Sequence, residues 1–339
     1  MKILVTGATG YIGSHTIISL LSEGYSVVGI DNLSNSSNCS SVIEMISGVK
    51  FQFIYGDLND NELLDNIFLK HKIDTVIHFA GLKAVNESLK KPLDYYHNNI
   101  VGTINLLRHM LKYKILNFIF SSSATVYGQD AVIPYVETMK PGKILSPYGQ
   151  SKAMVERILS DVAVSNPNFR AVSLRYFNPI GAHKSGLIGE DPSNIPNNLV
   201  PYITQVAIGK REKLTIFGGD YPTEDGTCKR DYIHVLDLAE GHISALKWLK
   251  SNIDFTGVEV FNLGTGQTVS VLEIIQVFMM ETGQIIKYEY GPKRKGDLPQ
   301  FWANPKKAKK ILGWESKLSL SDMLKDAWNW QLKNPNGFE

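Results

Sequence analysis

Tyr148 and Lys152 place a phenol and an ammonium four positions apart, a spacing that puts both side chains on one face of a helix. Nearby positive charge favours a phenolate, so such a pair can exchange a proton with a substrate hydroxyl. The ordinary pKa of tyrosine is about 10, and ionisation near neutrality requires a fall of about 3, or about 4 kcal/mol. We therefore predict Tyr148 as an acid/base group beside Lys152, with Ser123 hydrogen-bonded to the same substrate oxygen.

The spacing alone carries little weight, because a chain of this composition contains about one such pair by chance. A tyrosine and a lysine on an exposed surface are the alternative interpretation. The place of the pair in the chain favours a catalytic role. The pair follows the fifth predicted strand, 117–122, which is directly followed by Ser123. Open α/β sheets bind their ligands at the carboxyl ends of strands.

Gly7-Ala8-Thr9-Gly10-Tyr11-Ile12-Gly13 follows a predicted strand, Ile3–Thr6, and leads straight into a helical pattern. The backbone N–H groups of such a turn can approach a pyrophosphate, and the helix dipole adds about 0.3–1 kcal/mol. Three glycines at this spacing are expected by chance about 0.2 times, so the motif is weak without its context. The order of strand, turn and helix favours a dinucleotide site over a glycine turn needed only for packing.

The second predicted strand, Val27–Asp31, ends in an acid about twenty residues after the glycines. A carboxylate there would hydrogen-bond the adenosine ribose hydroxyls. It should select NAD over NADP, because a 2′-phosphate about 4 Å away would be repelled by about 4 kcal/mol, and no Lys or Arg stands between Asp31 and Lys50. The alternative is that Asp31 caps a loop. Asp57, at the end of the third predicted strand, is predicted either to contact the adenine or to cap the next helix.

Strand-like and helical segments alternate through the first half of the chain, which predicts βαβ units and a Rossmann-like, doubly wound parallel sheet of the α/β class. After Asn178 the chain becomes rich in proline and glycine. We place a domain boundary there, giving 1–178 as the dinucleotide-binding domain and 179–339 as a smaller mixed α/β domain, from which some segments may return to the first. The six strands of the first half are predicted at 3–6, 27–31, 51–57, 75–79, 117–122 and 171–177.

The composition excludes several classes of protein. The chain has 339 residues with 35 basic and 33 acidic side chains, a net charge of +2 that argues against nucleic-acid binding. Its two cysteines, Cys39 and Cys228, support neither a disulfide framework nor a metal site. The N-terminal segment is typical of a strand rather than a signal peptide, and no apolar run reaches about 18 residues. We expect a cytoplasmic protein with no membrane partner.

The glycine turn, Asp31, Ser123 and the Tyr148/Lys152 pair resemble the extended branch of the short-chain dehydrogenase/reductases. Longer stretches, at 31–33, 78–83, 121–128, 175–178 and 221–226, resemble the UDP-glucose (UDP-galactose) 4-epimerase family, and the likeness runs from residue 1 to about 330. The resemblance implies bound, recycled NAD. The residues that would surround it are Gly7, Gly10, Tyr11, Ile12, Gly13, Asp31, Asn32, Leu33, Ser34, Asn35, Ser36, Asp57, Leu58, Phe79, Ala80, Gly81, Leu82, Lys83, Asn98, Ser123, Tyr148, Lys152 and Phe177.

The same resemblance implies UDP-galactose and UDP-glucose as substrates, and the second domain as the part that binds them. Arginine is scarce here, and its guanidinium fork suits a diphosphate. For both Arg230 and Arg294, a surface ion pair is the alternative, for example that of Arg230 with Asp231. The residues that the resemblance assigns to the substrate are Thr125, Asn178, Asn198, Thr215, Ile216, Phe217, Arg230, Arg294, Asp297 and Phe301.

The family's reaction oxidises C4 of the sugar, turns the ketone over and returns the hydride. Related 4,6-dehydratases carry an Asp-Glu pair just after the catalytic hydroxyl residue, whereas here Ser123 is followed by Ala124, Thr125 and Val126. Dehydration is therefore disfavoured, decarboxylation of a UDP-uronate stays open, and a non-catalytic NAD-dependent regulator is the alternative of another class. In this family a large aromatic residue at the position of Phe301 accompanies plain hexoses, so the resemblance implies that N-acetylated UDP-hexosamines are poorer substrates. The family's habit implies a homodimer through two helices of the first domain.

Overall fold

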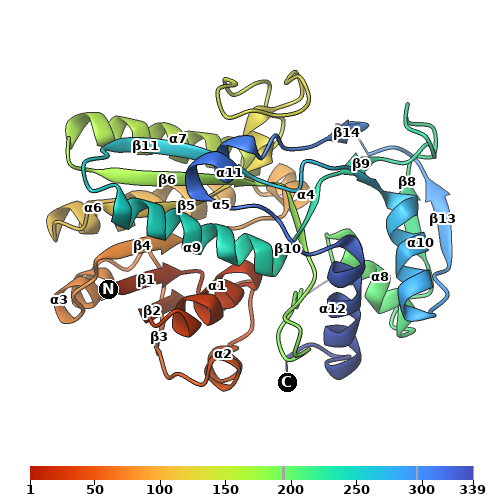
Figure 1. Cartoon of the computed structure of the whole chain (residues 1–339), viewed down its shortest axis with the longest axis horizontal. Coiled ribbons are helices and arrows are strands. Elements are labelled where there is room, and N and C mark those ends of the chain that lie inside the picture. Colours follow the sequence, from red (N-terminus) through yellow and green to blue (C-terminus); the bar gives the residue numbers. More distant parts are fainter. Residues whose placement is uncertain (193–194, 295–296, 339) are drawn as a thin grey trace. The chain divides into compact units, whose positions relative to one another are not determined.

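The computed structural model describes residues 1–192, 195–294 and 297–338 (Figure 1). Its backbone contacts divide the chain into two compact units. The first unit comprises Met1–Asp130, Lys140–Arg175 and Glu240–Phe261, and the second comprises Ala131–Met139, Tyr176–Ala239 and Asn262–Glu339. Within the described residues, no helix is both long enough and apolar enough to cross a membrane.

A seven-stranded sheet forms the centre of the first unit, in the order β11-β6-β5-β4-β1-β2-β3. Strand β1 pairs in parallel with β2 and β4, β2 with β3, and β4 with β5. The predicted α/β fold with a Rossmann-like, doubly wound sheet is therefore confirmed. The strands are β1 (Lys2–Thr6), β2 (Ser26–Asp31), β3 (Gln52–Tyr55), β4 (Thr75–His78), β5 (Asn117–Ser123), β6 (Arg170–Tyr176) and β11 (Gly257–Leu263).

Helices alternate with these strands, as Figure 1 shows. Apolar side chains from α3, α6 and α7 pack with β1, β2, β4 and β5 in one buried cluster that includes Leu64, Leu106, Phe118 and Leu159. This cluster fixes the strand ends from which the site residues project. The helices are α1 (Tyr11–Ser22), α2 (Ser40–Ser47), α3 (Asn61–Lys70), α4 (Val85–Lys90), α5 (Pro92–Tyr96), the π-helix η1 (His97–Val101), α6 (Gly102–Lys112), the 3₁₀ helix η2 (Ala124–Tyr127), α7 (Pro147–Ser165) and α9 (Val235–Ser251).

The second unit contains small sheets, β10-β7, β12-β9-β14 and β13-β8. Helices α8, α10 and α12 bury its core around Ile203, Phe278 and Leu324. The elements are β7 (Asn178–Ile180), α8 (Leu199–Ala207), β8 (Leu214–Phe217), β9 (Lys229–Arg230), β10 (Tyr232–His234), β12 (Val269–Ser270), α10 (Val271–Thr282), β13 (Tyr288–Gly291), β14 (Gln300–Phe301), α11 (Lys306–Leu312) and α12 (Leu320–Lys333).

The two units differ from the predicted division at residue 178 in residues 176–178, which belong to the second unit, and in two longer segments. Residues 240–261 return to the first unit, because β11 extends the large sheet beside β6 and Gly257 N donates to Phe169 O at 2.8 Å. Residues 131–139 join the second unit, where Tyr135 N donates to Trp302 O and Asn304 N donates to Tyr135 O, both at 2.9 Å. Backbone pairing between segments far apart in sequence thus decides both cases.

Candidate active site

The glycine turn after β1 satisfies two separate demands. A Cβ on Gly7, where φ is 68°, would lie 2.7 Å from Ala80 N, and a Cβ on Gly13 would lie 2.1 Å from Gly7 O. These two glycines are therefore required by the packing of the turn itself. The nearest atom to a Cβ on Gly10 is 3.3 Å away, and its φ of −67° is ordinary. Gly10 caps α1 and leaves the positive end of the helix open to an anion.

Asp31, at the end of β2, links the glycine turn to the loop that follows β2 by hydrogen bonds. One carboxylate oxygen accepts from Thr9 N at 3.0 Å, and the other accepts from Leu33 N at 2.9 Å and Ser36 Oγ at 3.2 Å. Asp31 therefore does cap the loop that follows β2, as the alternative interpretation states. A carboxylate has about four acceptor positions, so a further hydroxyl can still bind, and the residues present fit a dinucleotide.

Asp57 does not cap the helix that follows it. Its oxygens accept from Asn32 Nδ2 at 2.7 Å and from Asn59 N at 2.8 Å, whereas the N-cap of α3 is Asp60, which accepts from Leu63 N. The capping alternative for Asp57 is therefore wrong. The carboxylate instead joins the loop after β2 to the loop after β3, where the predicted adenine contact would lie.

The predicted loop 79–83 is fixed by Asn99, a residue that the sequence did not single out. Asn99 Oδ1 accepts from Leu82 N at 2.8 Å, and Asn99 Nδ2 donates to Leu82 O and Ser151 Oγ, both at 3.0 Å. Asn99 lies in the π-helix η1, next to the predicted Asn98. Consecutive asparagines are poor helix formers, and short π-helical turns are frequent at functional sites. The two consecutive asparagines were the feature of the sequence that could have pointed to Asn99.

The structure brings Ser123, Tyr148 and Lys152 together at the carboxyl end of β5. Ser123 hydrogen-bonds the Tyr148 phenol. Lys152 Nζ donates to Ser121 O at 2.7 Å and lies 5.9 Å from the centre of the Tyr148 ring. Helix α7 starts immediately before Tyr148, where Ser146 accepts from Gly149 N and Pro147 fills the first helical position. Lys152 is only 6% exposed, so the interpretation of an exposed surface pair is wrong.

The surroundings of the phenol act against its ionisation. Burial raises the pKa of Tyr148, and the hydrogen bond with Ser123 acts in the opposite direction. Burial also lowers the pKa of Lys152 to about 8. On balance the buried surroundings therefore raise, rather than lower, the pKa of Tyr148.

In the second unit, Arg230 lies against an aromatic ring and an acid. Its guanidinium carbon is 4.7 Å from the centre of the Phe301 ring, and Nη2 is 3.6 Å from Asp297 Oδ1. Asp231 is fully buried and accepts from the backbone N–H groups of residues 265, 266 and 303. The alternative of an Arg230–Asp231 ion pair is therefore wrong, and Arg230 stays with the predicted substrate set.

Phe301 belongs to an aromatic cluster. Its ring stacks on Tyr135 at 5.9 Å and 7°, and lies 6.1 Å from Phe177. Phe177, predicted beside the cofactor, thus belongs to the second unit, and Tyr135 was not predicted at all. Elsewhere in this unit, the guanidinium of Arg294 lies 4.0 Å from the Phe217 ring. The remaining predicted substrate residues of this unit lie on β7 (Asn178), on β8 (Thr215 and Ile216) and before α8 (Asn198, which donates to Glu190).

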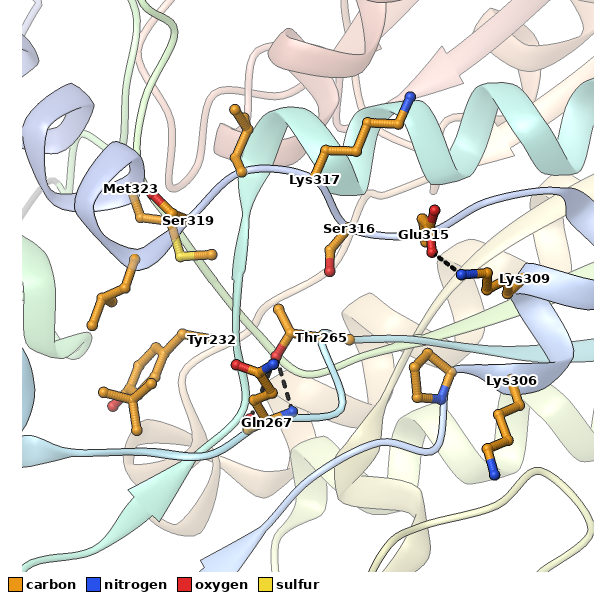
Figure 2. Close-up of a pocket in the computed structure, with 15 residues that line it drawn as sticks. Tyr232, Thr265, Gln267, Lys306, Lys309, Glu315, Ser316, Lys317, Ser319 and Met323 are labelled. Atoms are coloured by element: carbon orange, nitrogen blue, oxygen red, sulfur yellow. Dashed lines mark hydrogen bonds and ion pairs between the residues drawn. The ribbon is translucent and has the colours of Figure 1, made fainter.

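A cavity of about 420 Å³ in the second unit shares no lining residue with this predicted set (Figure 2). Lysines at 306, 309 and 317 line it, and Lys309 pairs with Glu315.

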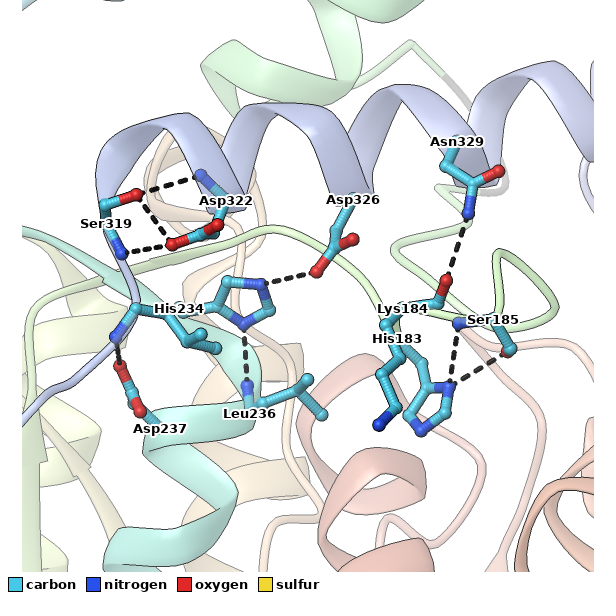
Figure 3. Close-up of polar contacts among 11 residues, drawn as sticks. His183, Lys184, Ser185, His234, Leu236, Asp237, Ser319, Asp322, Asp326 and Asn329 are labelled. Carbon is cyan, nitrogen blue, oxygen red and sulfur yellow. Dashed lines mark hydrogen bonds and ion pairs between the residues drawn. The ribbon is translucent and has the colours of Figure 1, made fainter.

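Helix α12, which contributes to the lining of this cavity, is attached through the buried His234 (Figure 3). His234 donates from Nε2 to Asp326 at 3.2 Å and accepts at Nδ1 from Leu236 N at 3.0 Å. These contacts fix the helix.

Comparison with known proteins identifies the family. A family model described as GDP-mannose 4,6 dehydratase matches residues 4–327. The UDP-glucose 4-epimerases of Erwinia amylovora and Neisseria meningitidis serogroup C are 55% and 54% identical over 338 and 339 residues, covering 99% and 100% of this chain and 99% of each relative. The crystal structure of UDP-glucose 4-epimerase from Bifidobacterium longum in complex with NAD+ and UDP has a TM-score of 0.95 at 48% identity and covers 100% of both chains. The chain therefore belongs to the extended short-chain dehydrogenase/reductases and, within them, to the UDP-glucose 4-epimerase family.

Proposed function

We propose that this chain interconverts UDP-galactose and UDP-glucose by inverting C4 of the sugar, with Tyr148 as the acid/base group. The observation that carries the proposal is the arrangement of Ser123, Tyr148 and Lys152 at the end of β5. The two curated relatives are named for this activity, and the solved relative holds NAD+ and UDP. The chain supplies a cofactor half in the first unit and a substrate half in the second.

The first unit has the groups that a dinucleotide requires. Gly10 leaves the N-terminus of α1 open to the pyrophosphate, and Asp31 retains an acceptor position for the ribose hydroxyls. Asn99 fixes the loop 79–83 beside them. NAD, when bound, would supply the acceptor for the C4 hydride and a positive ring charge near the phenol. Such a charge opposes the effect of burial on the pKa of Tyr148.

Tyr148 would take the proton from the sugar O4 as C4 is oxidised, and would return it when the 4-keto sugar is reduced on its other face. Ser123 holds the phenol by a hydrogen bond, and Lys152 adds a buried cation beside it. The proton and the hydride both return to the sugar, so the reaction has no net redox change. Proton transfer from a positioned side chain contributes typically about 10²–10⁴-fold to the rate.

The second unit would hold the nucleotide and border the reacting sugar at Phe301. Arg230 and Arg294 each present a guanidinium next to an aromatic ring, and a planar fork binds a diphosphate by two parallel hydrogen bonds. Phe301 packs within an aromatic cluster, and its bulk is the basis for predicting that N-acetylated UDP-hexosamines are poorer substrates. Replacing Phe301 by a small residue should raise the relative kcat/KM for those sugars. An unchanged ratio would reject this part of the proposal.

The matching family model is described as a dehydratase, yet the residues favour epimerisation. Removal of water across C5 and C6 requires an acid and a base beside the catalytic hydroxyl. In this chain Thr125 follows instead, and its hydroxyl donates to Ser123 at 3.0 Å. Decarboxylation of a UDP-uronate is the second candidate reaction. A homodimer and a cytoplasmic location remain predictions.

The proposal is tested by purifying the protein without added cofactor, denaturing a sample and measuring released NAD. The native protein is then given UDP-galactose alone, and formation of UDP-glucose is followed. We expect close to one NAD per chain and conversion with no added NAD. Release of NAD without any conversion would favour the regulator, and loss of carbon dioxide from UDP-glucuronate would favour the decarboxylase.

A further inference from the structure

The hydroxyl and carbonyl groups at the end of β5 contact three successive turns of α7. Ser123 hydrogen-bonds Tyr148, and the carbonyl two residues earlier accepts from Lys152. Between them, Ser122 Oγ donates to Glu156 Oε1 at 2.5 Å. Tyr148, Lys152 and Glu156 are spaced by four residues, so they form one stripe along the helix. The established pattern explains only the first two members of this stripe.

Glu156 is anchored from a second strand by a buried ion pair. Arg175, on β6, donates from Nε to Oε1 at 2.9 Å and from Nη2 to Oε2 at 2.6 Å, with both residues less than one tenth exposed. The guanidinium carbon also lies 4.7 Å from the centre of the Tyr127 ring. A buried pair of this kind is expensive to desolvate, and its best-attested use is to fix one register among several.

We propose that Glu156, fixed by Arg175, is a positioning residue that sets α7 along β5 so that Ser123 meets Tyr148. The inference rests on the proposed function. Glu156 lies two turns from Tyr148, about 12 Å along the helix axis. A helix held at this point cannot slide along the strand, and a displacement of about 1 Å at reacting groups can cost about 10²-fold in rate.

Ser122→Ala is the most informative variant, because it removes one hydroxyl and leaves the ion pair intact. We expect kcat to fall about tenfold, with KM changed less than about twofold and the NAD content unchanged. Glu156→Gln should lower kcat further, although it also removes the carboxylate that balances the buried charge of Arg175. The matched control is Asp161→Asn, on the same helix, where Asp161 pairs with Arg157 at 2.9 Å on the exposed face.

The pH profile separates positioning from a purely structural role. The Ser123 hydrogen bond lowers the pKa of Tyr148, so loosening it should raise that pKa and move the acidic limb of the kcat profile to higher pH. If Ser122→Ala lowers only the unfolding temperature, and its kcat and acidic limb match those of Asp161→Asn, then the proposal is overturned.

A titration of the Tyr148 phenol in the absence of substrate tests the positioning role independently of the proposed function. The ultraviolet difference between each protein and its Tyr148→Phe counterpart reports the ionisation of this phenol in the protein as purified. We expect a higher midpoint in Ser122→Ala than in the parent or in Asp161→Asn. Equal midpoints would overturn the positioning role, even if the parent protein failed to convert UDP-galactose.

Discussion

The two units build their parts of the site in different ways. In the first, the predicted residues lie at or just after the carboxyl ends of strands in one sheet: the glycine turn after β1, Asp31 on β2 and Ser123 on β5. The backbone topology itself gathers them. In the second, they are dispersed over small sheets and depend on side-chain contacts, such as that of Arg230 with Phe301. Substitutions in the first unit should therefore affect cofactor retention and turnover, and those in the second should affect substrate affinity.

The largest effect is expected for Tyr148→Phe. The variant removes the proton carrier and keeps the ring, so kcat should fall by about 10³-fold while the NAD content and the unfolding temperature stay the same. Steady-state kinetics and release of NAD on denaturation measure both. Tyr113→Phe, which removes a phenol that donates to Asp65 in the same unit, is the control and should remain active. Retained activity in Tyr148→Phe would remove the acid/base assignment.

A smaller effect is expected for Arg230→Lys in the second unit. An ammonium cannot reproduce the fork, and hydrogen bonds to charged groups contribute about 1.5–3 kcal/mol, so KM for UDP-galactose should rise about 10- to 100-fold. The NAD content should not change. Arg211→Lys serves as the control, because that guanidinium also lies over a ring, Tyr202 at 4.9 Å, but is outside the predicted set. A loss of NAD in Arg230→Lys would contradict the assignment of cofactor binding to the first unit alone.

The glycine turn offers a test of packing against ligand binding. Gly13→Ala forces a Cβ to within 2.1 Å of Gly7 O, so the free energy of unfolding should fall by about 1–3 kcal/mol. Gly10→Ala meets a milder contact, 3.3 Å from Gly7 O, so it should lose NAD while destabilising the cofactor-free protein less than Gly13→Ala does. Chemical denaturation and NAD content measure the two quantities. The distinction fails if Gly10→Ala retains its NAD.

The smallest effect concerns the sheet rather than the site. His78 is buried between the hydroxyls of Thr6 and Thr103, and burial lowers its pKa to about 3. The unfolded chain binds a proton near pH 6.5 and the folded chain does not, so stability falls as the pH drops below that value. From pH 6.5 to 5.5 the loss is about 1 kcal/mol. Denaturation at both pH values should show this slope reduced in His78→Gln and largely kept in His71→Gln, whose histidine is less buried.

Much of the first unit was predictable, because strand and helix patterns alternate and chemistry gathers at strand ends. The sequence could not show that β11 (Gly257–Leu263) completes the large sheet, since an apolar strand does not reveal which edge it joins. It also could not show the true partner of Arg230. Asp231 is adjacent in sequence but points to backbone amides, whereas Asp297 approaches from far along the chain. The periodicity of a sequence does not predict side-chain contacts between segments that are far apart along the chain.

Glu156 shows the same limit inside the predicted unit. It lies one helical turn after Lys152, so its face of α7 was predictable from the spacing. Its partners were not, because Ser122 and Arg175 come from two different strands. A buried charge can be suspected from sequence, but only the structure shows what compensates it.

The central claim is that the hydride removed from C4 returns to the same carbon while Tyr148 carries the proton. It is tested most directly with UDP-galactose bearing deuterium at C4, incubated with the protein as purified and without added cofactor. We predict UDP-glucose that keeps the deuterium at C4. Loss of the label to solvent, or a requirement for added NAD at each turnover, would contradict the account.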